Sequence, residues 1–209
     1  MPEELHNVCE SSIDTFREIG NIGSGNAATS LAAILNMQIS MSVPEVEIVP
    51  FDHIINILNG PENLVVGVLV NMSGDLNGYI LMILEMSDAY EMASMALQKE
   101  KPMPQVLTPE ILDEMDCSTL TEIANILVGS YLSAICAMTS LRVIPSVPQL
   151  AIDMVGAIIS IVLIEYGKIG DSVLFLKTQF SDVHKKLAGH FFLIPDFASY
   201  NILMNSLGL

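Results

Sequence analysis

Apolar and polar positions follow two different periods along the chain, and the changes of period mark its helices and strands. Residues 10–35 place apolar side chains at helical spacing, which predicts a long helix. Residues 64–72 and 79–86 are runs rich in Val, Ile and Leu, which is typical of strands. Residues 74–78 supply turn chemistry between these two runs, so we expect an antiparallel hairpin there.

The rest of the first half predicts shorter elements. Residues 38–51 read as extended structure that is broken at Pro44, and residues 52–58 as a short helix. Ser87 is expected to cap a helix that ends near residue 98. Residues 99–107 contain two prolines behind a charged run, which indicates a linker.

The second half repeats this order. Thr108 and Pro109 are typical of a helix start, and a long helix is expected over about residues 118–140. An extended piece at 143–145, a helix or a strand over 150–164, a second hairpin and a last helix from Phe197 follow.

Antiparallel hairpins together with long helices predict an α+β fold. We expect one domain over residues 1–209, built from two pseudo-symmetric halves at about 10–98 and 108–209. The predicted core is an antiparallel sheet with two long helices packed on it, related by a pseudo-twofold axis.

Charge and hydropathy exclude several classes of partner. The chain has 24 acidic and only 8 basic residues, so its net charge of −16 argues against nucleic acid and against anionic membrane surfaces. The most apolar run, residues 157–164, is too short to span a bilayer, so no membrane insertion is expected. The first residues are acidic and lack an apolar signal core, which favours the cytoplasm.

One polar pattern occurs twice at a constant offset of 104 residues. Its first copy consists of Asp14, Glu18, Asn21 and Pro44, and its second of Ser118, Glu122, Asn125 and Pro148. Glu and Asn three apart on a helix project from the same face. Either copy alone would be read as an ordinary solvated face, but nothing in core packing requires the same acid and amide in two diverged helices.

An acid with an amide suits a chemistry in which a partner supplies the reactive groups. An asparagine side chain both donates and accepts hydrogen bonds, so it can hold a water for in-line attack on a phosphoryl group. A glutamate cannot attract phosphate, but it can pair with a Lys beside one. The substrate would then bring its own Lys and metal ion, as a protein aspartyl-phosphate does. The histidines are scattered and no HExxH motif occurs, so we expect no metal site in this chain.

Both copies resemble the signature of the CheC family, within the CheC, CheX and FliY phosphatase superfamily. The pattern is Asp or Ser, three residues, Glu, two residues, Asn, then twenty-two residues to Pro, and each copy matches it in full. The resemblance implies a phosphatase of the phosphorylated chemotaxis response regulator CheY. It makes Asn21 and Asn125 the water-positioning residues, and Glu18 and Glu122 the contacts to the regulator's Lys.

The remaining roles also follow from the resemblance. Asp14 and Ser118 become supporting docking residues, and Pro44 and Pro148 are read as structural. No cofactor is expected in this chain, because the regulator would supply Mg²⁺. The family binds the receptor deamidase CheD, which enhances its activity, and we place the CheD contact at Asp153, a carboxylate in apolar surroundings.

Two other functions stay open. The first is a non-catalytic adaptor that binds phosphorylated CheY, CheD or flagellar switch components; the second, a metal or small-molecule enzyme, lacks a ligand or nucleophile pattern. Internal pseudo-symmetry favours a monomer.

Overall fold

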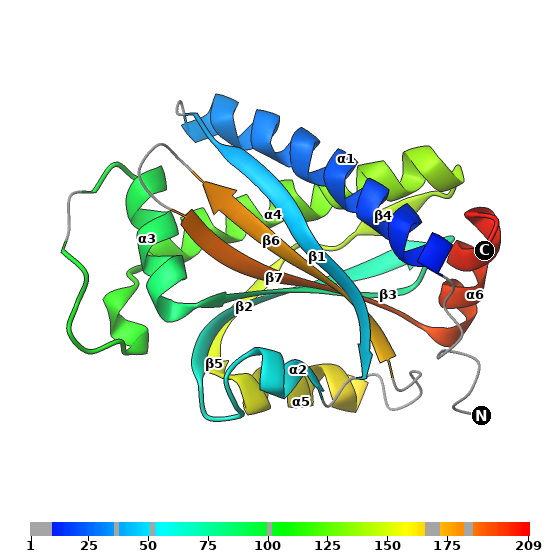
Figure 1. Ribbon diagram of the computed structural model, residues 1–209. Coiled ribbons are helices and arrows are strands. Elements are labelled where there is room, and N and C mark those ends of the chain that lie inside the picture. Colours follow the sequence, from blue (N-terminus) through cyan, green and yellow to red (C-terminus); the bar gives the residue numbers. More distant parts are fainter. Residues whose placement is uncertain (1–9, 36–37, 51–52, 100–101, 166–171, 182–185) are drawn as a thin grey trace.

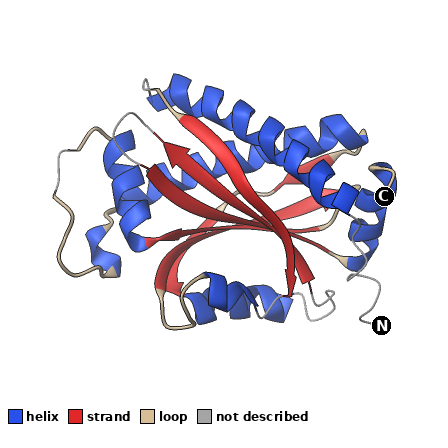
Figure 2. Cartoon of the chain, viewed as in Figure 1, coloured by secondary structure: helices blue, strands red, loops and turns tan. Residues whose placement is uncertain are grey.

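The chain folds as two helical layers around a strongly twisted antiparallel sheet (Figures 1 and 2). The computed structural model describes residues 10–35, 38–50, 53–99, 102–165, 172–181 and 186–209. Its helices are α1 (Glu10–Leu35), α2 (His53–Ile57), α3 (Met86–Ala96), the 3₁₀ turn η1 (Pro109–Ile111), α4 (Glu114–Thr139), α5 (Val155–Glu165) and α6 (Phe197–Ser206). Its strands are β1 (Ser40–Pro50), β2 (Leu64–Gly74), β3 (Gly78–Glu85), β4 (Val143–Pro145), β5 (Gln149–Met154), β6 (Ser172–Ser181) and β7 (Lys186–Pro195).

From either edge of the sheet inward, the strands are of the same kinds: a strand that follows a long helix, then the first and the second strand of a hairpin. Their order runs β1-β6-β7-β3-β2-β4, with β5 also paired to β2, and every pairing is antiparallel. The central strands β3 and β7 are the second strands of the two hairpins. Each hairpin is flanked by the strand that follows the long helix of the other half, because β1 pairs with β6 while β4 and β5 pair with β2. The halves thus exchange their outer strands.

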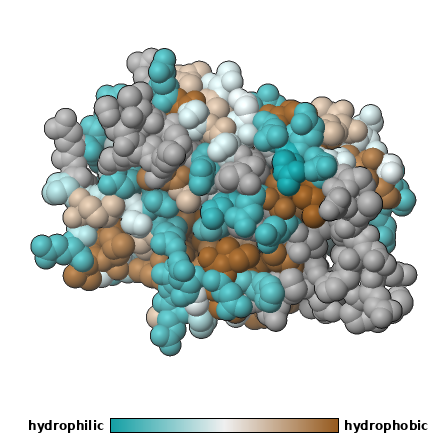
Figure 3. All heavy atoms as spheres, viewed as in Figure 1, coloured by the Kyte–Doolittle hydropathy of each residue, from teal (hydrophilic) through white to brown (hydrophobic). Residues whose placement is uncertain are grey.

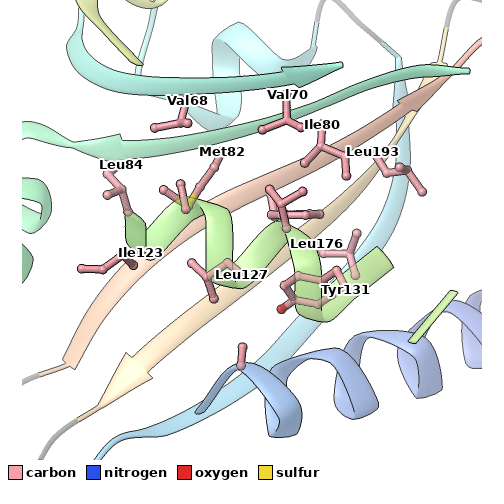
Figure 4. Packing of buried hydrophobic residues seen from close by; sticks show 14 of the residues in the cluster. Val68, Val70, Ile80, Met82, Leu84, Ile123, Leu127, Tyr131, Leu176 and Leu193 are labelled. Atoms are coloured by element: carbon pink, nitrogen blue, oxygen red, sulfur yellow. The ribbon is translucent and has the colours of Figure 1, made fainter. Parts of the chain in front are cut away.

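Both faces of the sheet are covered, which explains the nearly continuous apolar runs in its strands. Alternate side chains of β3 point to opposite layers: Ile80 and Met82 join the cluster beneath α1 and α4, while Leu81 and Ile83 join the cluster beneath α2 and α5. Figure 4 shows Ile123, Leu127 and Tyr131 on α4, among side chains of the sheet. On the face seen in Figure 3, apolar residues form a band between α1 and α2.

The long helices cross the sheet side by side and run in opposite directions (Figure 1). By length and composition α4 could cross a membrane, but 56% of its most apolar window is buried inside the fold. Its apolar face packs against the sheet, as the core helix of a globular domain does. The charge-poor sequence of α4 is therefore explained by burial within the protein.

Most predicted elements are confirmed, including the helix over residues 10–35, both hairpins, the strand at 143–145 and the helix that begins at Phe197. The segment 150–164, left open between helix and strand, contains both, with β5 ending at Met154 and α5 beginning at Val155. The break expected at Pro44 is an irregularity in the register of β1 with β6, between Ser42 and Glu45.

Three helix starts differ from the prediction. Ser87 does not cap α3, since Glu85 is the N-cap residue and no side chain closes that end. Thr108 precedes only the 3₁₀ turn η1, and its side chain makes no capping hydrogen bond. The long helix α4 begins at Glu114, four residues before the predicted start, because Asp113 and Asp116 form a reciprocal capping box.

Candidate functional site

The first copy of the repeated pattern lies along the solvent side of α1. Asp14, Glu18 and Asn21 are exposed, and they follow one another at helical spacing on a single face. The opposite face buries Phe16 and Ile19, which belong to the main core cluster. Burial of that face fixes the rotation of the helix about its axis, so the three polar side chains must point into water.

The second copy has the same placement on α4. Ser118, Glu122 and Asn125 are exposed, while Ile123 and Leu127 on the other side are almost fully buried. Both helices are 26 residues long, and Asp14 and Ser118 each lie four residues after the helix start. Because α1 and α4 run in opposite directions, the two copies point outward near opposite ends of one helix pair (Figure 1).

The acid and the amide of each copy are available to a partner. Within the part of the chain that the structure describes, the side chains of Glu18, Asn21, Glu122 and Asn125 have no hydrogen-bond or ion-pair partner. An exposed Glu or Asn on a helix gains little stability from its surroundings. These four side chains can therefore bind a partner without losing an internal contact, and the helices that carry them are held in place by packing.

The start of α4 is fixed by a charged cluster that the sequence prediction did not include. Lys99 Nζ lies 2.6 Å from Asp116 Oδ1 and 3.1 Å from Asp113 Oδ2, which ties the end of the first half to the capping box of α4. The hydrogen bond from Lys99 to Asp116, and then that to Asp113, raise the pKa of Lys99. In the sequence, this helix start is indicated by Asp113 followed three residues later by a second acid, Asp116, which is the spacing of a capping box.

The two copies differ at their edges. On α1 the guanidinium of Arg17 pairs with the carboxylate of Asp14, at the exposed N-terminal end of the polar face. On α4 the corresponding residues are neutral, Thr121 and Ser118, and the Thr121 hydroxyl donates to the carbonyl oxygen of Cys117. The first copy therefore presents an ion pair beside its glutamate, and the second presents hydroxyls.

Both prolines of the pattern lie where the strand after a motif helix is interrupted. Pro44 falls within the irregular register of β1. Pro148 falls in the gap between β4 and β5, immediately before β5 begins at Gln149. Proline cannot donate to a sheet ladder, so each residue suits a break in the pairing of an edge strand. This position is compatible with the structural role that the sequence predicts for them.

Asp153 lies on the edge strand β5 and belongs to neither polar face. Its side chain is exposed, and Oδ1 accepts a hydrogen bond of 2.7 Å from the backbone N–H of Met154. Apolar side chains of the same region are also exposed, namely Met154 at 51% and, on α5, Ile161, Leu163 and Ile164 at 49%, 52% and 81%. The assignment of Asp153 to a partner contact stays a prediction.

A cavity of about 280 Å³ is found on the α5 side of the sheet, lined by Leu69, Asn71, Tyr79, Ser146, Gln149 and Ile161, none of which belongs to the pattern. Among the described residues, no three His, Cys, Asp or Glu side chains gather as a metal site would require. The acid and the amide of each copy are exposed on a helix surface, where another molecule can reach them.

Comparison with known proteins places the chain in a family. A family model described as the CheC-like family matches residues 12–48 and 115–152, which contain both copies of the pattern. The CheY-P phosphatase CheC of Bacillus subtilis (strain 168) is 33% identical over 206 residues, covering 98% of this chain and 97% of that protein. The chain therefore belongs to the CheC-like family.

Two more distant proteins are also similar to this chain. The flagellar motor switch phosphatase FliY of Bacillus subtilis (strain 168) is 27% identical over 146 residues, covering 70% of this chain and 37% of that protein. The crystal structure of Thermotoga maritima FliY superposes with a TM-score of 0.76 at 17% identity, covering 97% of this chain and 98% of that one. The latter likeness confirms the predicted α+β fold.

Proposed function

We propose that this protein is a phosphatase that hydrolyses the aspartyl-phosphate of a chemotaxis response regulator, CheY. The proposal is supported by identity over nearly the whole chain to a protein named as a CheY-P phosphatase. The observation that carries it is the presence of two Glu and Asn pairs, exposed and unpaired in the described structure, at equivalent positions of two packed helices. A purely structural helix face has no need of such a repeat.

The chemistry assigned to each residue follows from its functional groups. Asn21 or Asn125 would enter the regulator's site and orient a water in line with the scissile P–O bond, because an amide can donate and accept at once. Glu18 or Glu122 would pair with the regulator's Lys beside the phosphate, and this contact would keep the asparagine amide in position next to the phosphoryl group. The regulator would bring its own Mg²⁺ as part of the substrate. Water attack on phosphorus then releases inorganic phosphate and restores the Asp carboxylate.

Decay of phosphorylated CheY in the presence of Mg²⁺ tests this function. We would compare the wild type with Asn21→Ala, Asn125→Ala and the double variant, and use Asn26→Ala as a matched control. Asn26 is an exposed asparagine of α1 that lies off the polar face. We expect the wild type and Asn26→Ala to accelerate the decay equally. Asn21→Ala and Asn125→Ala should each accelerate it less, and with the double variant the decay rate should equal the spontaneous rate.

The same assay separates the enzyme from the adaptor. An adaptor would bind phosphorylated CheY without changing its decay, and the motif variants would alter binding alone. Wild-type protein that leaves the decay rate unchanged, with or without CheD, would overturn the phosphatase. A double variant that retains full acceleration would instead overturn the role of the two asparagines.

We further propose that CheD binds at Asp153 and the exposed apolar residues of α5 and raises phosphatase activity, with the protein acting as a cytoplasmic monomer. The support is the exposed carboxylate near the end of β5, together with the exposed apolar side chains of α5, the helix that follows directly. Asp153→Lys should weaken CheD binding in calorimetry while leaving the basal decay of phosphorylated CheY unchanged. Glu47→Lys, at an exposed site on β1 at the opposite edge of the sheet, serves as the control. Equal CheD affinity of wild type and Asp153→Lys would remove this assignment.

A further inference from the structure

Glycines lie four residues after each motif asparagine, at Gly25 on α1 and Gly129 on α4. They are again separated by 104 residues. Residues four apart on a helix lie one above the other, so each glycine continues the polar face by one turn beyond the asparagine. Both positions fall in the interior of a 26-residue helix, where glycine is among the least favourable residues.

Packing within the protein does not account for these two glycines. A β-carbon added at Gly25 or at Gly129 would have nothing within 4 Å. Gly23 shows the contrast, because a β-carbon there would meet Tyr131 Cδ1 at 2.5 Å and the Tyr131 Cα at 3.1 Å. Gly23 is therefore required by the helix contact, whereas Gly25 lowers helix stability without any internal contact that depends on it.

We propose that Gly25 and Gly129 are docking residues of the two sites, which keep the helix surface bare so that the main chain of the phosphorylated receiver can approach it. This inference rests on the proposed function. An asparagine side chain is short, so its amide reaches a recessed phosphoryl group only if the partner's surface comes close to the helix backbone. A β-carbon one turn away on the same face would hold that surface off.

The shape of the site supports a steric role for glycine. The acid, the amide and the bare turn form one continuous strip at each copy, in the order Glu18, Asn21, Gly25 and Glu122, Asn125, Gly129. The strip is exposed at Gly25 and half-buried at Gly129. Each receiver would thus lie over the C-terminal side of its asparagine, against exposed helix backbone.

The test replaces each glycine with a small and with a long helix-forming residue. We would make Gly25→Ala with Gly129→Ala, and Gly25→Gln with Gly129→Gln, and measure steady-state dephosphorylation of CheY together with the melting temperature. Ala33→Gln with Ala137→Gln is the matched control, since both alanines are exposed on the same helices, two turns further on and off the strip. Circular dichroism would verify the helix content of all variants.

We expect both glycine variants to melt at or above the wild-type temperature. We also expect KM to rise severalfold with Ala and more than tenfold with Gln, while kcat changes less and the control matches the wild type. A merely structural glycine would change the melting temperature and leave KM alone. Gln variants that are folded and have the wild-type KM would overturn the inference.

The outcomes also distinguish this inference from the proposed function. Active wild-type protein with unaffected glycine variants overturns the docking role only. If wild-type protein does not accelerate decay, the proposed phosphatase activity is overturned. The docking role of the glycines is then tested by the affinity of each variant for the beryllofluoride-loaded receiver. Weaker binding by the Gln variants then supports it, and unchanged or absent binding overturns it.

Discussion

Gly23 of α1 lies directly against Tyr131 of α4, with no room for a side chain between them. A β-carbon on Gly23 would stand 2.5 Å from Tyr131 Cδ1. The Tyr131 ring in turn packs against Phe191 of β7 at a centroid distance of 4.5 Å, and its hydroxyl lies 3.0 Å from Thr178 Oγ1 of β6. This residue pair therefore sets the spacing of the two motif helices and links both to the centre of the sheet.

Gly23→Ala and Gly25→Ala should have opposite effects on stability. The first forces α4 or the Tyr131 ring to move and should lower the free energy of unfolding by about 1–3 kcal/mol. The second adds a methyl group in open space and should leave stability unchanged or raise it by up to about 1 kcal/mol. Urea unfolding of the two variants measures the difference. Equal destabilisation by both would show that the contact with Tyr131 is not tight.

Tyr131→Phe should destabilise the protein although it retains the aromatic ring. It leaves the buried hydroxyl of Thr178 without its partner, which costs about 1–2 kcal/mol. Burial raises the pKa of Tyr131 to about 12, so the phenol stays protonated in the accessible range. Thr178→Val should have a similar cost, and the double variant should lose less than the sum. Strict additivity in this double-mutant cycle would contradict a hydrogen bond between the two hydroxyls.

His190 should make the fold sensitive to mild acid. Burial, and then the positive charge of Lys177 on the neighbouring strand, lower the pKa of His190 from 6.5 to about 4, with Glu45 acting in the opposite direction. Between these pH values the unfolded chain binds a proton that the folded protein does not. The contribution of His190 to the free energy of unfolding is therefore fully present above pH 6.5 and is lost as the pH falls toward 4.

The size of this effect is measurable by substitution. From pH 7 to pH 5, His190 should contribute a loss of about 2 kcal/mol to the free energy of unfolding. His190→Gln should remove that part of the pH dependence, as seen in urea midpoints at the two pH values. His53→Gln, at an exposed histidine of α2, should behave as the wild type. An unaltered pH dependence in His190→Gln would assign the acid sensitivity to other groups.

Glu18→Gln with Glu122→Gln should weaken docking more than it weakens chemistry. Loss of an exposed ion pair with the regulator's Lys is worth about 1 kcal/mol, so KM should rise about fivefold with little change in kcat. Added salt should raise the wild-type KM toward that of the variant. Glu62→Gln, an exposed acid elsewhere, is the control. A KM that is independent of salt in the wild type would argue against the Lys contact.

Local pattern predicted most of the helices and strands, and also both polar faces. The face of α1 was predictable because Phe16 and Ile19 fix its rotation by apolar spacing alone. The segment 150–164 was ambiguous for a physical reason: it is apolar on nearly every side, so no period separates β5 from α5. The early start of α4 required side-chain hydrogen bonds between Asp113 and Asp116, for which apolar spacing carries no signal.

Non-local features were beyond prediction from the pattern. Nothing in the sequence of β1 indicates that it pairs with β6 rather than with its own hairpin. The different roles of Gly23 and Gly25 could not be separated either, because only the position of Tyr131 distinguishes them. A glycine in a helix usually marks close approach by another element, which holds at Gly23 but not at Gly25, where an added β-carbon would meet nothing within 4 Å.

The exchange of outer strands has a consequence for the integrity of the molecule. Since β1 is hydrogen-bonded to β6 and β5 to β2, a single cut in the exposed connection around Gln105 and Val106 would sever the chain without separating its parts. The two fragments would stay joined by four strand pairings, β1 with β6, β2 with β4, β2 with β5 and β3 with β7. Each fragment alone would lack half of the sheet. Co-expressed fragments should therefore associate into one folded protein. Because each fragment carries one complete copy of the pattern, the protein could be used as a split-protein reporter.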